Sequence, residues 1–188
     1  FADENQRLSE EENSTLNDIR EGAELDDELR LTKNYRNTRE IAKLAREFFV
    51  GLETGKPNLP DRRGEKPVVK HAKDVEQTAR FIARYERTND HERVGVLVKN
   101  TSTQMELLEL LRKADTNHPV QAYSNRERIN TLDFTTSGIQ LLCFASAKGL
   151  EFDTVFMPEI QKYTSDVDSA TTKMELYVMI SRARDRLF

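Results

Sequence analysis

The chain alternates between two patterns of apolar residues. Short apolar runs occur at 94–98, 138–145 and 154–160, and such runs are typical of buried strands. Shorter runs at 68–71 and 120–124 predict two further strands. Between the runs lie segments in which apolar residues recur every three or four positions, the spacing of one helix face.

The first clear helix is predicted over 37–49. Asn37 can cap its amino end, and Glu40 follows at the spacing of a capping box. Residues 51–67 hold three glycines and three prolines and predict a loop. Further helices are predicted at 74–86, 101–114 and 171–183.

Strands that alternate with helices of this length predict an α/β fold with a mainly parallel sheet and helices on both faces. We expect one domain over residues 1–188, entered through an acidic connection at 1–30. Ligands of such sheets sit beyond the carboxyl ends of the strands. Four polar segments are predicted at or near such ends: 3–7, 34–38, 98–102 and 146–151.

Charge is distributed unevenly along the chain. The net charge is −4, but residues 1–30 contain 3 basic and 11 acidic side chains. The remaining residues are therefore net basic, which permits a face that binds nucleic acid although the total argues weakly against one. We interpret the acidic run as a solvated surface.

Cysteine, histidine and long apolar runs are scarce. The single cysteine, Cys143, excludes a disulfide within the chain, which suits the cytoplasm. The three histidines match no metal-ligand spacing, and no apolar run is long enough to predict a membrane span. Because the sequence begins with Phe1 and ends with Phe188, we expect a piece excised from a longer protein.

The common phosphate-binding motifs GxxxxGK[ST] and GxGxxG are absent, and no nucleophile stands beside a base. Two arginines remain as candidates. Arg36 immediately precedes a predicted helix, where it suits either an anionic ligand or a neighbouring carboxylate. Arg182 lies at the end of the last predicted helix, where the helix dipole also favours a cation.

Five segments, in order, resemble UvrD/Rep-type superfamily 1 DNA helicases. "ADENQRL" resembles motif III, "LTKNYRNTREIAKLA" motif IV, "LLCFASAKGLEFDTVFM" motif V and "ELYVMISRARDRL" motif VI. "VGVLVKNTSTQMELLELL" resembles the intervening strand–helix segment that faces nucleic acid. The resemblance spans nearly the whole chain and implies the second, C-terminal RecA-like (P-loop NTPase-like) motor domain, which lacks a Walker A loop of its own.

The resemblance also implies roles at the nucleotide. Arg36 and Arg182 would contact the γ-phosphate as arginine fingers, because a guanidinium stays charged and binds phosphate oxygens in pairs. Tyr35 would stack on the adenine, and Gln6 would sense the γ-phosphate. Glu151 would accept hydrogen bonds from the ribose or from another polar group.

The remaining roles concern DNA. By resemblance, the loop 146–151 touches both nucleotide and nucleic acid, with Gly149 permitting a tight turn, so Ser146 and Lys148 are candidate contacts to the strand. Asn100 and Thr101 would hydrogen-bond backbone phosphates. The implied partners are single-stranded or partly duplex DNA and an N-terminal RecA-like domain of the same protein. That domain would supply the phosphate loop, the ligands of Mg²⁺ and the catalytic glutamate for ATP, so this chain alone is expected to be inactive.

The sequence departs from the family at three places. Cys143 and Ala145 replace the Thr and His of motif V, and Ser181 stands where Thr is common in motif VI. The link between 120–124 and the next strand is too short for a 2B subdomain. These departures leave two alternatives open: an ATPase module that remodels a protein–nucleic acid complex, such as transcription machinery, without unwinding DNA, or a degenerate binding domain. A GxxxxGK[ST] motif upstream of Phe1 would exclude the latter.

Overall fold

The computed structural model describes residues 16–23, 34–51, 55–125, 129–162, 166 and 168–188. Its centre is a six-stranded sheet in the order β3-β2-β4-β1-β5-β6, in which only the pairing of β3 with β2 is antiparallel. The predicted α/β class with a mainly parallel sheet is therefore confirmed. The strands are β1 (Arg93–Val98), β2 (Gln121–Ser124), β3 (Ile129–Asn130), β4 (Gly138–Cys143), β5 (Phe152–Phe156) and β6 (Ala183–Leu187).

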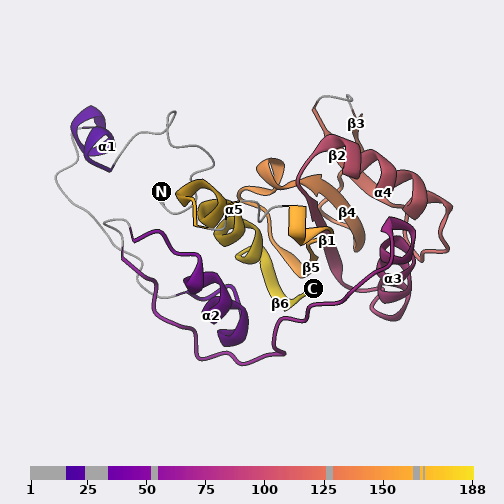
Figure 1. The fold of residues 1–188 in the computed structure, drawn as a ribbon, viewed down its shortest axis with the longest axis horizontal. Helices are drawn as coiled ribbons and strands as arrows, with labels where there is room; N and C mark the ends of the chain where they lie inside the picture. Colours follow the sequence, from indigo (N-terminus) through magenta and orange to yellow (C-terminus); the bar gives the residue numbers. More distant parts are fainter. Residues whose placement is uncertain (1–15, 24–33, 52–54, 126–128, 163–165, 167) are drawn as a thin grey trace.

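Helices cover both faces of this sheet (Figure 1). On one face α2 and α5 pack against Leu97, Leu142 and Val155. On the other, α3 and α4 pack against Val96 and Leu141. Alternate residues of the central strands thus enter two separate cores, as the pleat requires. The helices are α1 (Leu16–Ala23), α2 (Arg39–Glu47), α3 (Val75–Thr88), α4 (Thr101–Lys113) and α5 (Ala170–Ile180).

Side chains cap α2, α3 and α4 at their amino ends. Asp74 caps α3, and Asn100 caps α4. The predicted cap Asn37 is wrong: Thr38 caps α2, and its side chain accepts from the backbone N–H of Ile41. The amide of Asn37 is committed instead to carbonyl groups at the start of β6.

The sheet differs from the predicted strands at both ends of the chain. The predicted strand 68–71 is wrong, because this segment makes a single backbone hydrogen bond to β6, from Val68 N to Leu187 O at 3.0 Å. The last predicted helix ends three residues early, at Ile180, and the chain then forms the edge strand β6. β6 has three consecutive charged residues between Ala183 and Leu187, so it lacks the apolar run or the alternation that would predict a strand.

The segment 144–151 connects two strands that both pair in parallel with β1. It therefore returns from the carboxyl end of β4 to the amino end of β5, and it does so without an α-helix. A 3₁₀-helix, η2 (Phe144–Ala147), starts the return, and Ala147 is buried against the core beneath α5. Gly149 adopts φ +84°, which confirms the tight turn predicted at this glycine.

No helix in the part of the chain that the structure describes is both long and apolar enough to cross a bilayer.

Candidate functional site

Three of the predicted nucleotide residues, far apart in sequence, lie together at the amino ends of β5 and β6. Glu151 immediately precedes β5, Arg182 immediately precedes β6, and Phe152 N donates to Arg182 O at 3.0 Å. The side chain of Arg36 forms an ion pair with Glu151. The expectation that all polar segments gather at carboxyl ends is thus wrong for 34–38, because the turn docks onto the first residues of β6.

Asparagines hold the turn that carries Arg36. The side-chain oxygen of Asn34 accepts from the backbone N–H of Arg36 at 3.0 Å and of Asn37 at 3.2 Å. The buried Asn37 amide donates to Ser181 O and Ala183 O, on both sides of Arg182. Asn37 therefore fixes the spacing between the two candidate arginines.

Arg36 and Glu151 are both partly exposed, with side-chain exposures of 33% and 42%. The Nε atom of Arg36 donates to Oε1 of Glu151. This pair confirms the local alternative of an arginine bonded to a carboxylate, and it also leaves the guanidinium accessible. A phosphate could replace the carboxylate with the same hydrogen-bond geometry.

Arg182 is fully buried, with 0% exposure. Its Nε donates to Val178 O at 3.0 Å, so it satisfies a carbonyl group in the last turn of α5. One terminal nitrogen donates to Ser181 Oγ at 2.9 Å, and the other lies 3.4 Å from Leu150 O. In this conformation Arg182 braces the helix end and presents no surface to a ligand.

The remaining nucleotide candidates differ in what the structure says of them. Tyr35 is 77% exposed beside Arg36, so its ring is accessible for stacking. Gln6 lies outside the described residues.

Of the predicted nucleic-acid residues, those that follow β1 and β4 in the chain lie at the carboxyl ends of these strands, away from the amino ends of β5 and β6, where Arg36 and Glu151 meet. Asn100 and Thr101 follow the carboxyl end of β1, and Ser146 follows that of the adjacent β4; Val98 and Cys143 are register partners there. The side-chain oxygen of Asn100 accepts from Thr103 N at 2.9 Å as the α4 cap. Lys148 is exposed at the end of η2.

The sequence analysis missed the charged side chains that surround the amino end of β6, near Arg36. Arg62, in the predicted loop, forms an ion pair with Asp185 and donates to Arg36 O at 2.5 Å and Arg184 O at 2.6 Å. The adjacent Arg-Arg pair at 62 and 63 was the only signal, and it did not indicate a partner.

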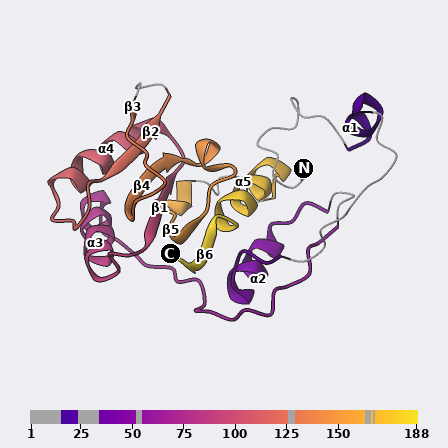
Figure 2. The same ribbon diagram turned by 180° about the vertical axis from the view of Figure 1, so that it is seen from behind.

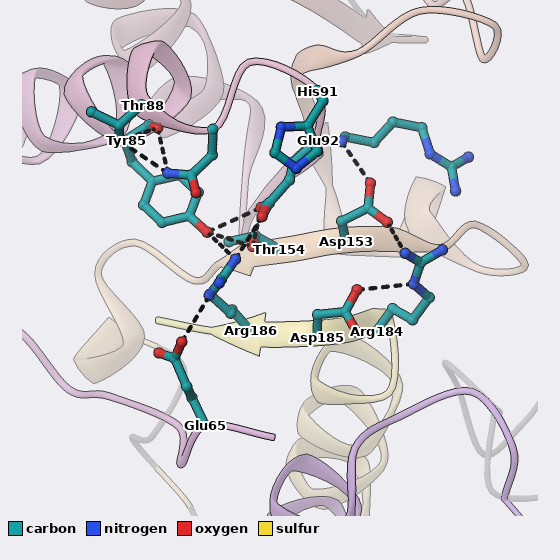
Figure 3. A network of polar contacts seen from close by, with 12 residues as sticks. Glu65, Tyr85, Thr88, His91, Glu92, Asp153, Thr154, Arg184, Asp185 and Arg186 are labelled. Atoms are coloured by element: carbon teal, nitrogen blue, oxygen red, sulfur yellow. Dashed lines mark hydrogen bonds and ion pairs between the residues drawn. The ribbon is translucent and has the colours of Figure 1, made fainter. Parts of the chain in front are cut away.

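A second group of polar side chains extends this network along β6 (Figure 3). Arg186 donates to Glu92 at 2.5 Å and to Glu65 at 3.2 Å. The buried Glu92 also accepts from Tyr85 and Thr154. Burial and the charge of Glu92 contribute to a raised pKa of the Tyr85 hydroxyl.

A groove of about 340 Å³ opens between this network and the loop. Its lining contains three arginines and three carboxylates, so it has no excess of either charge. Among the described residues no three His, Cys, Asp or Glu side chains form a metal site. The arrangement can therefore supply a guanidinium, an aromatic ring and a carboxylate to a nucleotide, but phosphate-loop and metal ligands would come from elsewhere.

The comparisons agree on the kind of protein that this chain resembles. No family model matches. The chain is 26% identical over 175 residues to a protein of Acanthamoeba polyphaga mimivirus named "Putative ATP-dependent DNA helicase"; the match covers 84% of this chain and 25% of that protein. The chain therefore spans about a quarter of that relative.

The crystal structure of the C-terminal domain of a possible DNA helicase from Lactobacillus plantarum superposes with a TM-score of 0.56 at 19% identity, over 82% of this chain and 84% of that one. The two chains thus share a fold.

Proposed function

We propose that this chain is the C-terminal motor domain of a UvrD/Rep-type superfamily 1 DNA helicase or translocase. One observation carries the proposal: Arg36, Glu151 and Arg182, singled out from three separate motifs, converge at the amino ends of β5 and β6. The match to the mimivirus protein named "Putative ATP-dependent DNA helicase" supports it.

The residues present fit one side of an ATP site. Tyr35 would stack on adenine, Glu151 would accept hydrogen bonds from the ribose, and Arg36 would bind the γ-phosphate. An N-terminal RecA-like domain would hold the triphosphate and Mg²⁺, and Gln6 would report the γ-phosphate. ATP supplies the free energy that drives closure of the two domains.

Arg36 would exchange its carboxylate partner for a phosphate. Glu151 keeps the guanidinium near its working position, and transfer of the arginine to the phosphate leaves Glu151 able to accept from the ribose. Arg182 would have to rotate away from Val178 O and Leu150 O to reach a phosphate, so Arg36 is the finger that needs the smaller movement.

At the other edge, Asn100, Thr101, Ser146 and Lys148 would contact a single DNA strand through its phosphates, which are the groups that position a protein on nucleic acid without reading sequence. Cycles of closure and reopening would then move the strand.

The test is an ATPase assay on a protein that joins this chain to the proposed N-terminal domain. We expect Arg36→Ala to lower kcat about 10³-fold or more, the range that arginine fingers contribute in other nucleotide hydrolases. Arg63→Ala is the matched control. The Arg63 side chain is exposed, and its ion pair with Glu40 is long, at 3.8 Å. Normal turnover in Arg36→Ala would refute the finger assignment.

A second function is favoured by one substitution. Ala145 stands where the resemblance places a DNA-contacting histidine. We propose as the alternative an ATPase that remodels a protein–nucleic acid complex without unwinding DNA. The same assay separates the two, because a translocase is stimulated strongly by single-stranded DNA and the remodelling module is not.

A further inference from the structure

Residues 57–70, here called the strap, run beside α2 and the edge strand β6 without forming a helix or more than a single bridge (Figure 2). Three backbone hydrogen bonds to other described residues fasten the strap. Asn58 O accepts from Asn34 N at 3.2 Å, Arg62 O accepts from Arg39 N at 2.7 Å, and Val68 N donates to Leu187 O at 3.0 Å. The strap is thereby tied to both the turn that carries Arg36 and the strand that follows Arg182.

Arg62 is the side chain of the strap that connects these two elements. One terminal nitrogen donates to the carbonyl oxygens of Arg36, at 2.5 Å, and of Arg184, at 2.6 Å. The other forms an ion pair with Asp185. A planar guanidinium can hold three oxygens in a fixed relation, whereas a lysine ammonium presents its donors from a single point.

From these contacts we infer that Arg62 is a positioning residue for Arg36. The inference rests on the proposed function of Arg36 as the phosphate ligand. Arg62 bonds the backbone carbonyl group of Arg36 itself. The backbone from which the Arg36 side chain extends is therefore held at a set distance from β6. It touches no reacting atom in this role and acts only through Arg36.

Asp185 completes the arrangement by holding Arg62 in place. Its pKa would be raised by partial burial, but hydrogen bonds from Arg62 and Arg184 and the positive charge of both keep it below the usual range. Asp185 is therefore ionised at neutral pH, and Arg62 remains paired there.

A purely structural role is the competing explanation, in which Arg62 only attaches the strap. The two differ in one measurable respect. Loss of attachment lowers stability whatever residue stands at 36, whereas loss of positioning lowers kcat only while Arg36 is present. A displacement of about 1 Å at a catalytic group can cost about 10²-fold in rate.

The experiment is a double-mutant cycle in the ATPase of the protein that contains both motor domains. Arg62→Ala, Arg36→Ala and the double variant are compared for kcat and for KM of ATP, with Arg63→Ala as the neighbouring control. We expect Arg62→Ala to lower kcat by about 10- to 100-fold with little change in KM. We expect no further loss when Arg62→Ala is added to Arg36→Ala. Arg62→Lys should restore folding stability more fully than kcat.

Three results would overturn the inference. Normal kcat in Arg62→Ala is one, and an equal loss of kcat in the presence and absence of Arg36 is another. If Arg62→Ala does not fold, the cycle is run with Arg62→Lys, and a wild-type kcat in that folded variant is the third. Should Arg36→Ala itself turn over normally, the proposed function fails together with this inference, whereas an effect of Arg36→Ala without one of Arg62→Ala removes the inference alone.

Discussion

Two arginines that a shared family role would treat as equivalent occupy different environments. Arg36 is a third exposed and bonded to one carboxylate, while Arg182 is enclosed and satisfies oxygens of Val178, Leu150 and Ser181. A loss of activity after substitution therefore has different meanings at the two positions. At 182 it combines any lost ligand contact with damage to the end of α5.

Stability measurements separate these effects. We expect Arg182→Ala to lower the free energy of unfolding of the chain by about 2–4 kcal/mol, because it removes a large, fully buried side chain together with its hydrogen bonds to Val178 O, which keeps the one from Ser181 Oγ, and to Leu150 O. Arg36→Ala should change it by less than about 1 kcal/mol, as is usual for a partly exposed ion pair. Urea unfolding followed by circular dichroism provides both values. Equal losses at the two positions would contradict the burial described for Arg182.

At the scale of elements, the contact between β1 and β5 depends on a missing side chain. A Cβ atom built on Gly95 would lie 2.5 Å from the ring of Phe152, which is itself fully buried. The glycine thus allows the ring of Phe152, the residue that follows Glu151 in the chain, to lie against β1. The packing of Phe152 against Gly95 therefore anchors the start of β5, the strand that follows Glu151.

Gly95→Ala should therefore lower the free energy of unfolding by about 1–3 kcal/mol through overpacking. Adding Phe152→Leu should return part of that loss, because the shorter side chain vacates the space. Gly22→Ala is the control, since no atom of the described residues lies within 4 Å of its Cβ position. Thermal unfolding of the original chain, of the single variants Gly95→Ala, Phe152→Leu and Gly22→Ala, and of the double variant tests this. Additive effects of Gly95→Ala and Phe152→Leu would show that the ring is not the obstacle.

Elements whose signals are local were predictable from the sequence. The apolar runs of β1, β4 and β5 mark buried strands, and the apolar spacing over 74–86 and 101–114 marks α3 and α4. β6 was missed because an edge strand can be charged, and 68–71 was predicted as a strand although one hydrogen bond is all it makes to β6.

The candidate site was predictable only in part, because its motifs are local in sequence but its contacts are not. The sequence motifs indicated Arg36, Glu151 and Arg182, and the structure brings them together. Arg62 could not be found, because its partners are Arg36 O, Arg184 O and Asp185, and no pattern along a single chain encodes contacts of that separation.

At the scale of the whole molecule, the charged edge along β6 makes stability depend on pH. The pKa of Asp185 is lowered in the fold, despite partial burial, by Arg62 and Arg184. The folded state then binds fewer protons than the unfolded chain. The contribution of Asp185 is therefore complete above its ordinary pKa of about 3.9 and is lost as the pH falls through the lower folded value. The effect of pH on the contribution of Glu175, in α5, has the opposite sign. Burial raises the pKa of Glu175, so its protonation at lower pH removes the free-energy cost of a buried charge.

Asp185→Asn tests this sign. We expect the variant to lose about 1 kcal/mol of unfolding free energy at neutral pH and to show a shallower decline below about pH 4 than the original chain. Urea unfolding at a series of pH values measures both. Parallel curves for the two proteins would mean that Asp185 titrates normally.

The segment 144–151 connects the end of β4 to the start of β5 in eight residues and contains no α-helix. Ser146 and Lys148 lie in its middle, and Glu151 ends it. Under the proposed function, a strand of DNA that shifts Ser146 and Lys148 also shifts the partner of Arg36. Thermodynamic reciprocity then requires that the factor by which DNA strengthens nucleotide binding equals the factor by which nucleotide strengthens DNA binding.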